Sequence, residues 1–200
     1  LRTRVLGESI DPYLPIVEKS IVRLHQMREL ITDVVDWAKI EAPDRERSLT
    51  ELDITRAAGA LVDELRKEAQ ARHIVIESEI EEALTMRGVA WEIDLILRHL
   101  LTNAVKYNKD GGRVAVSLKR VDSRLAVSVT DTGIGLTADE QARIFHEFVR
   151  IKKRETQDIR GTGLGLAIVK QLADLYGGTV SIKSEENKGS TFLVSLCCGD

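Results

Sequence analysis

The chain has 200 residues, of which 43% are hydrophobic and 30% charged, and this suits one ordinary domain plus a smaller element. Its net charge of −3 argues against a sequence-independent affinity for nucleic acid. No apolar run approaches the roughly 20 residues that span a membrane, so we expect no direct membrane contact from this stretch. The chain starts at Leu1 with neither a methionine nor a signal-like segment, and we expect it to be a piece of a longer protein.

Residues 11–41 repeat apolar side chains at seven-residue offsets, which is typical of a helix that packs against a partner helix. The seam consists of Val17, Ile21, Leu24, Ile31, Val35 and Ala38, and Arg28 interrupts it. One helix cannot bury such a seam alone, so the pattern predicts a partner helix. Residues 1–9 resemble the end of a preceding helix, and 43–47 a short charged linker.

Residues 49–196 mix the periods of helices and strands. We predict helices at about 54–71, 90–107, 137–144 and 163–176, and strands at 73–79, 113–120, 124–131, 178–184 and 190–196. Two hairpin-like strand pairs among them indicate an α/β sandwich with helices on one face of a mixed sheet. The polar segment 152–159 has no period, and this predicts a mobile loop.

Three short motifs in this second region carry the chemistry. The first, NAVKY at 103–107, lies at the end of a predicted helix. The amide oxygen of Asn103 is a suitable neutral ligand for magnesium, which prefers oxygen donors, and Lys106 is close enough along the helix to reach a phosphate. Both residues are also common on exposed helix surfaces, and taken alone that interpretation is favoured.

The second motif, DTGIG at 131–135, follows a predicted strand. An ionised carboxylate accepts hydrogen bonds only, and Asp131 therefore suits the exocyclic amino group of adenine. Gly133 and Gly135 let the backbone approach a flat base closely. The alternative is an aspartate in an ordinary turn at the end of a strand.

The third motif, GTGLG at 161–165, opens a predicted helix, and unpaired N–H groups at a helix start attract anions. Its spacing matches neither the dinucleotide-binding pattern G-x-G-x-x-G nor the P-loop pattern that ends in G-K-[ST]. In combination, the three motifs indicate an ATP pocket.

In this order, the motifs resemble the N, G1 and G2 boxes of sensor histidine kinases, which belong to the superfamily of gyrase, chaperone and mismatch-repair ATPases. The segment FHEFVR at 145–150 is similar to the family's F box, and KGSTF at 188–192 to its closing strand motif. Residues 30–41 resemble the second helix of the dimerisation and phosphotransfer domain. The resemblance covers nearly the whole chain.

The resemblance implies a role for each matching residue. Asn103 would bind magnesium, and with Lys106 and Arg150 near the phosphates it forms the implied catalytic set. Tyr107 would lie beside the nucleotide, Asp131 would bind the adenine, and Thr191 would hold the adenine side through water. The residues expected to shape the pocket are Gly133, Gly135, Gly161, Thr162, Gly163, Leu164 and Gly165. For the basic loop residues Lys152, Lys153, Arg154 and Arg160, phosphate contacts and a solvated loop both stay open.

Two positions depart from the family pattern. The N box usually opens with Asn, or with Glu in hydrolytic relatives, whereas this chain has His99, and imidazole is a poor magnesium ligand. The phosphoacceptor motif is incomplete at the start of the chain, where Arg4 stands in place of the expected proline. We therefore expect the acceptor histidine upstream of residue 1, and this fragment to bind ATP without phosphorylating itself.

The resemblance implies an α+β fold, an α/β sandwich of the histidine-kinase ATPase type at 46–200, preceded by an α-helical dimerisation hairpin fragment at 1–45. The implied activity is transfer of the ATP γ-phosphoryl to a histidine, with Mg²⁺, for relay to an aspartate of a response-regulator receiver domain. A homodimer through 1–41 and a cytoplasmic location are implied, with or without a membrane anchor elsewhere in the full-length protein. The alternatives are a nucleotide-sensing dimeric scaffold and an ATP-hydrolysing relative.

Overall fold

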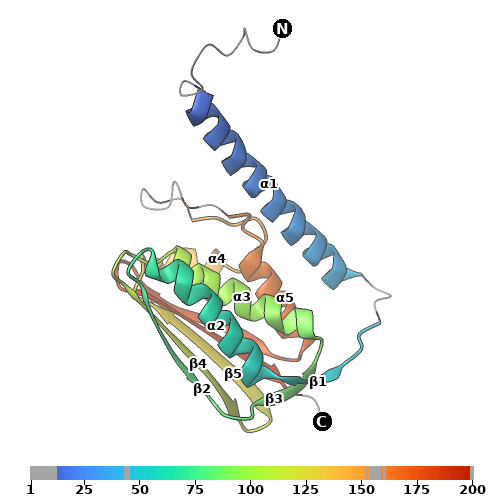
Figure 1. Cartoon of the computed structure of the whole chain (residues 1–200). Coiled ribbons are helices and arrows are strands. Elements are labelled where there is room, and N and C mark those ends of the chain that lie inside the picture. Colours follow the sequence, from blue (N-terminus) through green and yellow to red (C-terminus); the bar gives the residue numbers. More distant parts are fainter. Residues whose placement is uncertain (1–12, 43–45, 152, 154–158, 160, 199–200) are drawn as a thin grey trace.

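The computed structural model describes residues 13–42, 46–151, 153, 159 and 161–198. A long helix precedes a body in which helices cover one face of a sheet (Figure 1). The helices are α1 (Leu14–Glu41), α2 (Ile54–Gln70), α3 (Ala90–Lys106), α4 (Ala138–Arg143) and α5 (Gly165–Leu175). The strands are β1 (Thr50–Asp53), β2 (Val75–Ile80), β3 (Thr85–Gly88), β4 (Arg113–Val121), β5 (Arg124–Asp131), β6 (Thr179–Glu185) and β7 (Gly189–Cys197).

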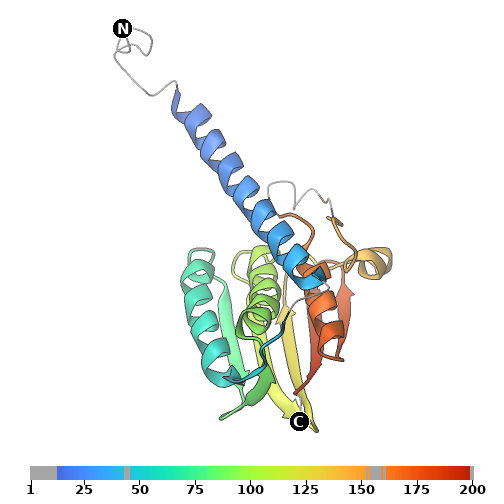
Figure 2. The same ribbon diagram turned by 90° about the vertical axis from the view of Figure 1, so that its right-hand side faces the viewer.

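Five strands form the main sheet in the order β2-β4-β5-β7-β6. The β2–β4 pair is parallel and the other three pairs are antiparallel, so the sheet is mixed as predicted. Figure 2 shows α2, α3 and α5 side by side across one face of this sheet. The central strand β5 ends at Asp131, which pairs with Val114 on one side and Ser190 on the other. This pairing fixes Asp131 at one end of the sheet's middle strand.

The core lies between the sheet and these three helices. Side chains of β4, β5 and β7 that alternate along each strand point inward, and they meet the apolar faces of the helices. The most central helix, α3, buries Ile93, Ile96, Leu97, Leu100 and Leu101. Each such side chain contributes on the order of 1.5–3 kcal/mol by leaving water. The position of α3 is therefore set by the core, and its last turn is held over the end of β5.

The predicted elements of the body are confirmed, and no end is shifted by more than two residues. The sequence did not indicate β1 and β3, which form a separate antiparallel pair of four-residue strands. Strand β1 follows the linker after α1 and leads into α2, and β3 leads into α3. The two strands therefore pair where α2 and α3 both begin. The predicted loop 152–159 lies largely outside the described residues, as does the predicted end of a first helix at 1–9.

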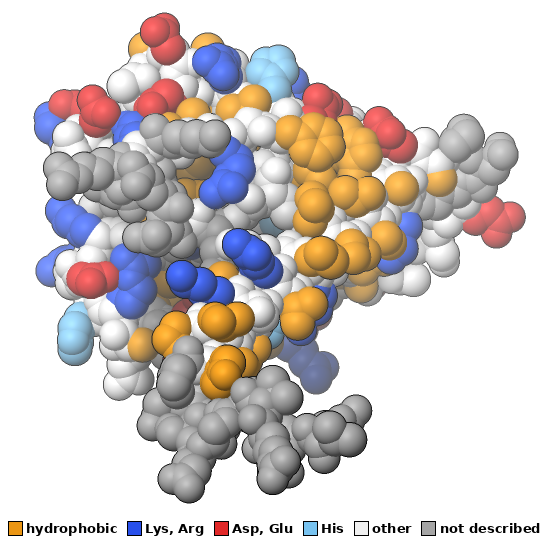
Figure 3. Space-filling view, turned by 90° about the horizontal axis from the view of Figure 1, so that it is seen from above, with side chains coloured by type: hydrophobic (Ala, Val, Ile, Leu, Met, Phe, Trp, Pro, Cys, Tyr) orange, Lys and Arg blue, Asp and Glu red, His pale blue; other side chains and the backbone are white. Residues whose placement is uncertain are grey.

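The helix α1 is confirmed, and most of it stands clear of the body. Its 28 residues span about 42 Å at 1.5 Å per residue. Its apolar seam is exposed, with Leu24 at 63% and Ile31 at 57% of full exposure. Figure 3 shows the apolar side chains along this helix as a band on the surface. None of the helices in the described part of the chain combines the length and the apolar content that crossing a bilayer requires.

A buried ion pair ties the segment after α1 to the body. Glu92 of α3 is fully buried, and Nη2 of Arg47 lies 2.8 Å from its Oε2 atom. The hydroxyl of Tyr176 donates to the same carboxylate at 2.6 Å and accepts from the backbone N–H of Val89 at 2.9 Å. These bonds satisfy a charge that would be costly to bury alone. The linker is thus anchored at the far end of α3 from the motif NAVKY.

Candidate functional site

A cavity of about 940 Å³ lies where α1, α3 and α5 meet the loop that follows β5. All three sequence motifs contribute to its lining. The predicted residues that line it are Asn103, Lys106, Tyr107, Asp131, Gly135, Arg150, Gly161, Thr162, Gly163 and Gly165. Segments that are 60 residues apart in sequence thus converge on one pocket, and its volume is large enough for a nucleotide.

The lining of the cavity includes Asp131, the last residue of β5. It is 6% exposed, and its Oδ1 atom accepts a hydrogen bond of 2.8 Å from the backbone N–H of Gly133. Burial raises the pKa of this carboxyl to about 6, although hydrogen bonds with the backbone of Gly133 and Ser190 act in the opposite direction. A buried acceptor of this kind is costly in a purely structural role, which favours a ligand that donates a hydrogen bond to it.

The two glycines after Asp131 are required by packing against the protein's own backbone. A Cβ atom at Gly133 would lie 2.2 Å from the carbonyl oxygen of Tyr107, and one at Gly135 would lie 1.9 Å from that of Glu185. The backbone N–H of Ile134 donates to the same Tyr107 carbonyl at 3.2 Å. Gly133 therefore docks this loop on the last turn of α3, and Gly135 docks it on the end of β6, a reason different from the approach to a flat base that the sequence suggested.

Positive charge gathers in the lining around the last turn of α3. The ammonium of Lys106 lies 5.7 Å from the centre of the Tyr107 ring and 3.1 Å from where a Cβ of Gly161 would be. Burial lowers the pKa of Lys106, Glu29 opposes this, and the nearby Arg150 lowers the pKa further. A cation that lies close enough to Lys106 to disfavour its charge suits a multiply charged anion between the two.

The glycine motif at 161–165 forms the start of α5 and opens toward these cations. Gly163 has φ +82, and a Cβ there would lie 2.8 Å from the carbonyl carbon of Phe148. Thr162 Oγ1 accepts from the N–H of Leu164 at 3.1 Å, while Leu164 itself is buried as the residue before the helix. The start of α5 thus presents free N–H groups and a positive dipole end beside Lys106.

The comparisons with known proteins agree with this geometry. Residues 88–199 match the family described as histidine kinase-, DNA gyrase B-, and HSP90-like ATPase. The chain belongs to this ATPase family. A sensor-like histidine kinase SenX3 of Mycolicibacterium smegmatis is 28% identical over 198 residues, which is 98% of this chain and 52% of that protein. Sensor protein DivL of Caulobacter vibrioides is 34% identical over 172 residues, 86% of this chain and 22% of that protein.

Among solved structures, full-length ShkA in complex with AMPPNP superposes with a TM-score of 0.75 at 30% identity, over 93% of this chain and 38% of that one. The histidine kinase ThkA in complex with the response regulator TrrA gives a TM-score of 0.70 at 19% identity, over 96% of this chain and 52% of that one. The latter likeness shows the fold alone. The chain spans about half the length of the curated relatives it matches, or less. The resemblance to a sensor histidine kinase core is thereby confirmed.

Within this histidine kinase-like ATPase fold, the unusual His99 packs between α3 and α5. A Cβ atom at Gly165 would lie 2.8 Å from its Nδ1 atom, so the imidazole occupies the space that the glycine leaves. Burial lowers the pKa of His99, and the carboxylates of Asp33 and Asp36 oppose this. Its buried Nε2 atom has no hydrogen-bond partner among the described residues. With the described residues, His99 thus makes the contacts of a side chain packed between the two helices.

Other predicted residues of the ATPase fold lie at the margin of the cavity or away from it. The guanidinium of Arg150 lines it and donates to the carbonyl of Ile159 at 2.8 Å. Among the described residues, Thr191 lies outside the lining, and its hydroxyl shares a hydrogen bond of 3.0 Å with that of Thr130. Arg160 falls outside the described residues.

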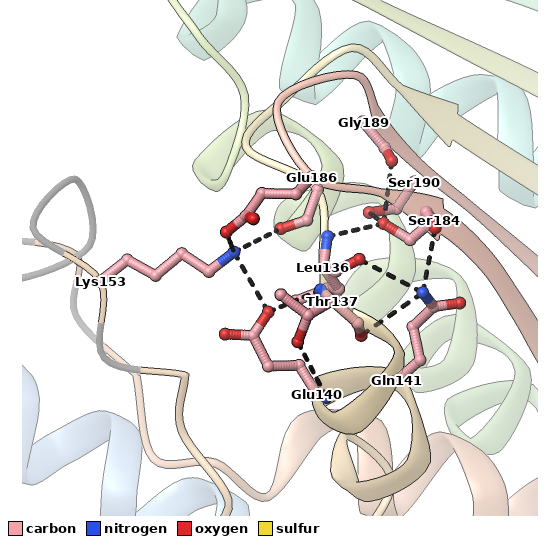
Figure 4. A network of polar contacts seen from close by, with 10 residues as sticks. Leu136, Thr137, Glu140, Gln141, Lys153, Ser184, Glu186, Gly189 and Ser190 are labelled. Atoms are coloured by element: carbon pink, nitrogen blue, oxygen red, sulfur yellow. Dashed lines mark hydrogen bonds and ion pairs between the residues drawn. The ribbon is translucent and has the colours of Figure 1, made fainter.

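The loop residue Lys153 is held by carboxylates of the body. Its Nζ atom lies 2.8 Å from Glu186 and 3.1 Å from Glu140, and it also contacts the carbonyl of Gly135 at 3.3 Å (Figure 4). Glu140 in turn completes the capping box of α4 with Thr137. Of the two roles left open for this lysine, the geometry favours neither phosphate contact nor a solvated side chain. It fastens the loop to the body.

The polar face of α1 is the part of the site that sequence reasoning missed. Arg28, Glu29, Thr32, Asp33 and Asp36 line the cavity, and the hydroxyl of Thr162 donates to the carboxylate of Asp33. The signal was present, because 29, 33 and 36 follow the i, i+4, i+7 spacing of one helical face. A polar face opposite an apolar seam is exposed to solvent on most surface helices, so the spacing alone does not distinguish a pocket lining from a solvated face.

Proposed function

We propose that this chain is the ATP-binding catalytic core of a sensor histidine kinase. It binds ATP with magnesium and transfers the γ-phosphoryl to a histidine on dimerisation helices, for relay to a response-regulator aspartate. The observation that carries the proposal is the convergence of the three motifs on one cavity, whose lining includes a buried acceptor, Asp131, and two cations, Lys106 and Arg150. The relatives ShkA, bound to AMPPNP, and ThkA, bound to TrrA, support the nucleotide and the partner class.

The proposed orientation of the nucleotide follows from charge. The adenine amino group donates to Asp131, the buried acceptor, and the triphosphate extends to Lys106, Arg150 and the start of α5. The distance between these two ends is bridged by the last turn of α3, where Tyr107 lies beside the nucleoside. This arrangement places the γ-phosphate near α1, at the side of the cavity from which an acceptor helix can approach.

The residues present fit a magnesium ion that is shared with the nucleotide. Asn103 offers a neutral oxygen, and among the described residues no group of three His, Cys, Asp or Glu side chains could hold a metal. Phosphate and water oxygens would therefore complete the octahedral shell that magnesium prefers. When bound, the ion would neutralise charge that develops on the phosphates during transfer.

The protein's own contribution is positioning and electrostatics. Lys106 and Arg150 would hold the phosphates in line with the incoming histidine, and the closed pocket would keep water from competing for the phosphoryl group. The exposed seam of α1 would pack against a second copy of the chain to form a homodimer. An ATP supply and a receiver-domain partner imply a cytoplasmic setting for this reaction.

The test is phosphoryl transfer from γ-labelled ATP to a supplied dimerisation domain that carries an acceptor histidine. We expect acid-labile label on the acceptor in the presence of magnesium, and none on the chain incubated alone. Release of labelled phosphate without labelled protein would indicate the hydrolytic relative, and tight binding without turnover would indicate the nucleotide-sensing scaffold. Either result would overturn the kinase proposal.

The variant Asn103→Ala sharpens the same test. Loss of one magnesium ligand should weaken magnesium-dependent ATP binding by at least about tenfold and abolish transfer. Binding of adenosine, which has no phosphates, should stay within about twofold of the wild type. Calorimetric titration with both ligands measures this. An equal loss for adenosine would mean that Asn103 supports the fold and not the ion.

A further inference from the structure

The C-terminal end of α3 is only partly satisfied by the residues that follow it, since the N–H of Tyr107 donates to the carbonyl of Asn103 at 2.9 Å and that of Asn108 to the carbonyl of Val105 at 3.3 Å. The last four carbonyl groups of an α-helix have no intrahelical donor, and they form the negative end of its dipole. In α3 this end carries Asn103, Lys106 and Tyr107, the residues of the proposed phosphate and magnesium site. Whatever satisfies these carbonyls also fixes the orientation of that turn.

The guanidinium of Arg72, in the turn between α2 and β2, supplies those partners. Its Nη1 atom donates to the carbonyl of Val105 at 2.8 Å, and its Nη2 atom donates to that of Asn108 at 2.7 Å. A longer contact of 3.4 Å joins Nη1 to the carbonyl of Lys106. Its Nε atom lies 2.9 Å from the carboxylate of Asp110, which holds the plane of the guanidinium.

These contacts leave Arg72 no role as a direct phosphate ligand, although it lines the cavity. Its donors point to backbone carbonyls on the outer side of the α3 turn, and its charge is balanced by Asp110. A positive charge at the negative end of a helix is favourable, and the flat fork of arginine can bind several carbonyls at once. Lysine, with one ammonium, can reproduce the charge but not the fork.

The turn held by Arg72 connects both ends of the site. The carbonyl of Tyr107 accepts from Ile134, and Gly133 fits directly against it. The buried side chain of Asn108 accepts from Thr132 Oγ1 at 3.2 Å and donates to the carbonyl of Arg113 at 2.9 Å. Displacement of this turn would therefore move the phosphate-binding side chains relative to Asp131.

We infer that Arg72 is a positioning residue for the nucleotide site, which aligns the magnesium and phosphate end of the pocket with its adenine end. The inference rests on the proposed function, because it concerns how that site binds the phosphates of ATP. It predicts that loss of Arg72 penalises ligands in proportion to their dependence on the phosphate end. A purely structural residue would penalise every ligand alike.

The experiment compares ATP with magnesium and adenosine in calorimetric titrations of Arg72→Met, which keeps an apolar stem but removes every donor. We expect the affinity for ATP with magnesium to fall about tenfold, and that for adenosine to change less than about twofold. Arg72→Lys should recover part of the loss, since it keeps the charge at the helix end. The control is Arg66→Met, because Arg66 is exposed on α2 and its guanidinium donates to Asp63 at 2.7 Å and to Ser78 at 3.3 Å, away from the α3 turn.

The outcomes separate this inference from the proposed function. If the wild type binds ATP with magnesium no better than adenosine, the proposed function fails, whatever the variants do. If the wild type prefers ATP and Arg72→Met keeps that preference, the inference fails alone. Equal losses for both ligands, accompanied by a lower melting temperature, would also overturn it. If Arg72→Met does not fold, the graded loss expected for Arg72→Lys decides the question.

Discussion

The helix α1 and the body that follows it use apolar residues in opposite ways. In the body, most leucine, isoleucine and valine side chains of α3, α5 and the sheet are buried in one core. In α1, Ile40 alone is buried, and the seam from Val17 to Val35 is exposed to at least 45% at each apolar position. The body has therefore completed its core within one chain, whereas α1 leaves its apolar seam exposed. The body contains the three motifs of the candidate site, and α1 exposes an apolar surface beside it.

A matched pair of substitutions tests this contrast most strongly. Leu100 is fully buried in the core, and Ile31 is 57% exposed on α1. Leu100→Glu buries an unpaired carboxylate, at a cost of several kcal/mol that rivals the whole stability of a domain. We expect this variant to be unfolded or to melt far below the wild type, as followed by circular dichroism.

The second variant of the pair, Ile31→Glu, should leave the melting temperature of the body unchanged. It should weaken self-association of the chain, because it adds charge to the exposed seam. Sedimentation at several concentrations measures the association. A chain that stays monomeric at high concentration, with or without the substitution, would remove the homodimer from the account. A large loss of thermal stability in Ile31→Glu would show that α1 shares the core of the body.

A substitution at the contact between α1 and the body should have a smaller effect, and it should strengthen ATP binding. Asp33 accepts from Thr162, and its charge lies near Lys106, which Glu29 also faces. These carboxylates repel a triphosphate, so Asp33→Asn, which keeps an acceptor, should raise the affinity for ATP by roughly three- to fivefold at low salt. Adenosine affinity should not change. Glu18→Gln on the same helix is the control, and an ATP affinity that falls in Asp33→Asn would contradict this electrostatic account.

The sequence predicted the elements of the body because their apolar patterns have clear periods. It also brought the three motifs together, since a strand end, a helix end and a helix start that carry complementary chemistry can meet at one edge of a sheet. Each of these motifs consists of residues that are adjacent in the chain, so each can be recognised from the sequence alone. The roles that the resemblance implies for Asn103, Lys106 and Asp131 stay predictions that binding experiments must test.

The features that the sequence did not reveal all depend on contacts between distant segments. The reason for Gly133 is the carbonyl of Tyr107, and the space for His99 is the missing Cβ of Gly165. Lys153 meets Glu186 across the fold, and the acidic face of α1 meets the pocket. A pattern of residue types cannot specify such neighbours, because each side chain alone is equally suited to solvent.

The central claim is that Asp131 recognises the adenine as an ionised acceptor. Its pKa is raised by burial to about 6 in the folded protein, so between this value and its usual range the folded state binds more protons than the unfolded state. The contribution of Asp131 to stability therefore falls as the pH rises toward 6. An adenine amino group that donates to the carboxylate favours its ionised form, so binding should be strongest above pH 6 and weaken below it.

The most direct test is calorimetric titration of adenosine between pH 7 and pH 5 with the wild type, Asp131→Asn and the exposed control Asp122→Asn. At one pH unit below the pKa only about a tenth of the carboxylate is ionised, so the account predicts a loss of up to about tenfold at pH 5 for the wild type and the control. Asp131→Asn should bind at least about tenfold more weakly at pH 7, with little dependence on pH. The claim would be contradicted if Asp131→Asn bound adenosine as tightly as the wild type, or if the wild-type affinity were the same at pH 5 and pH 7.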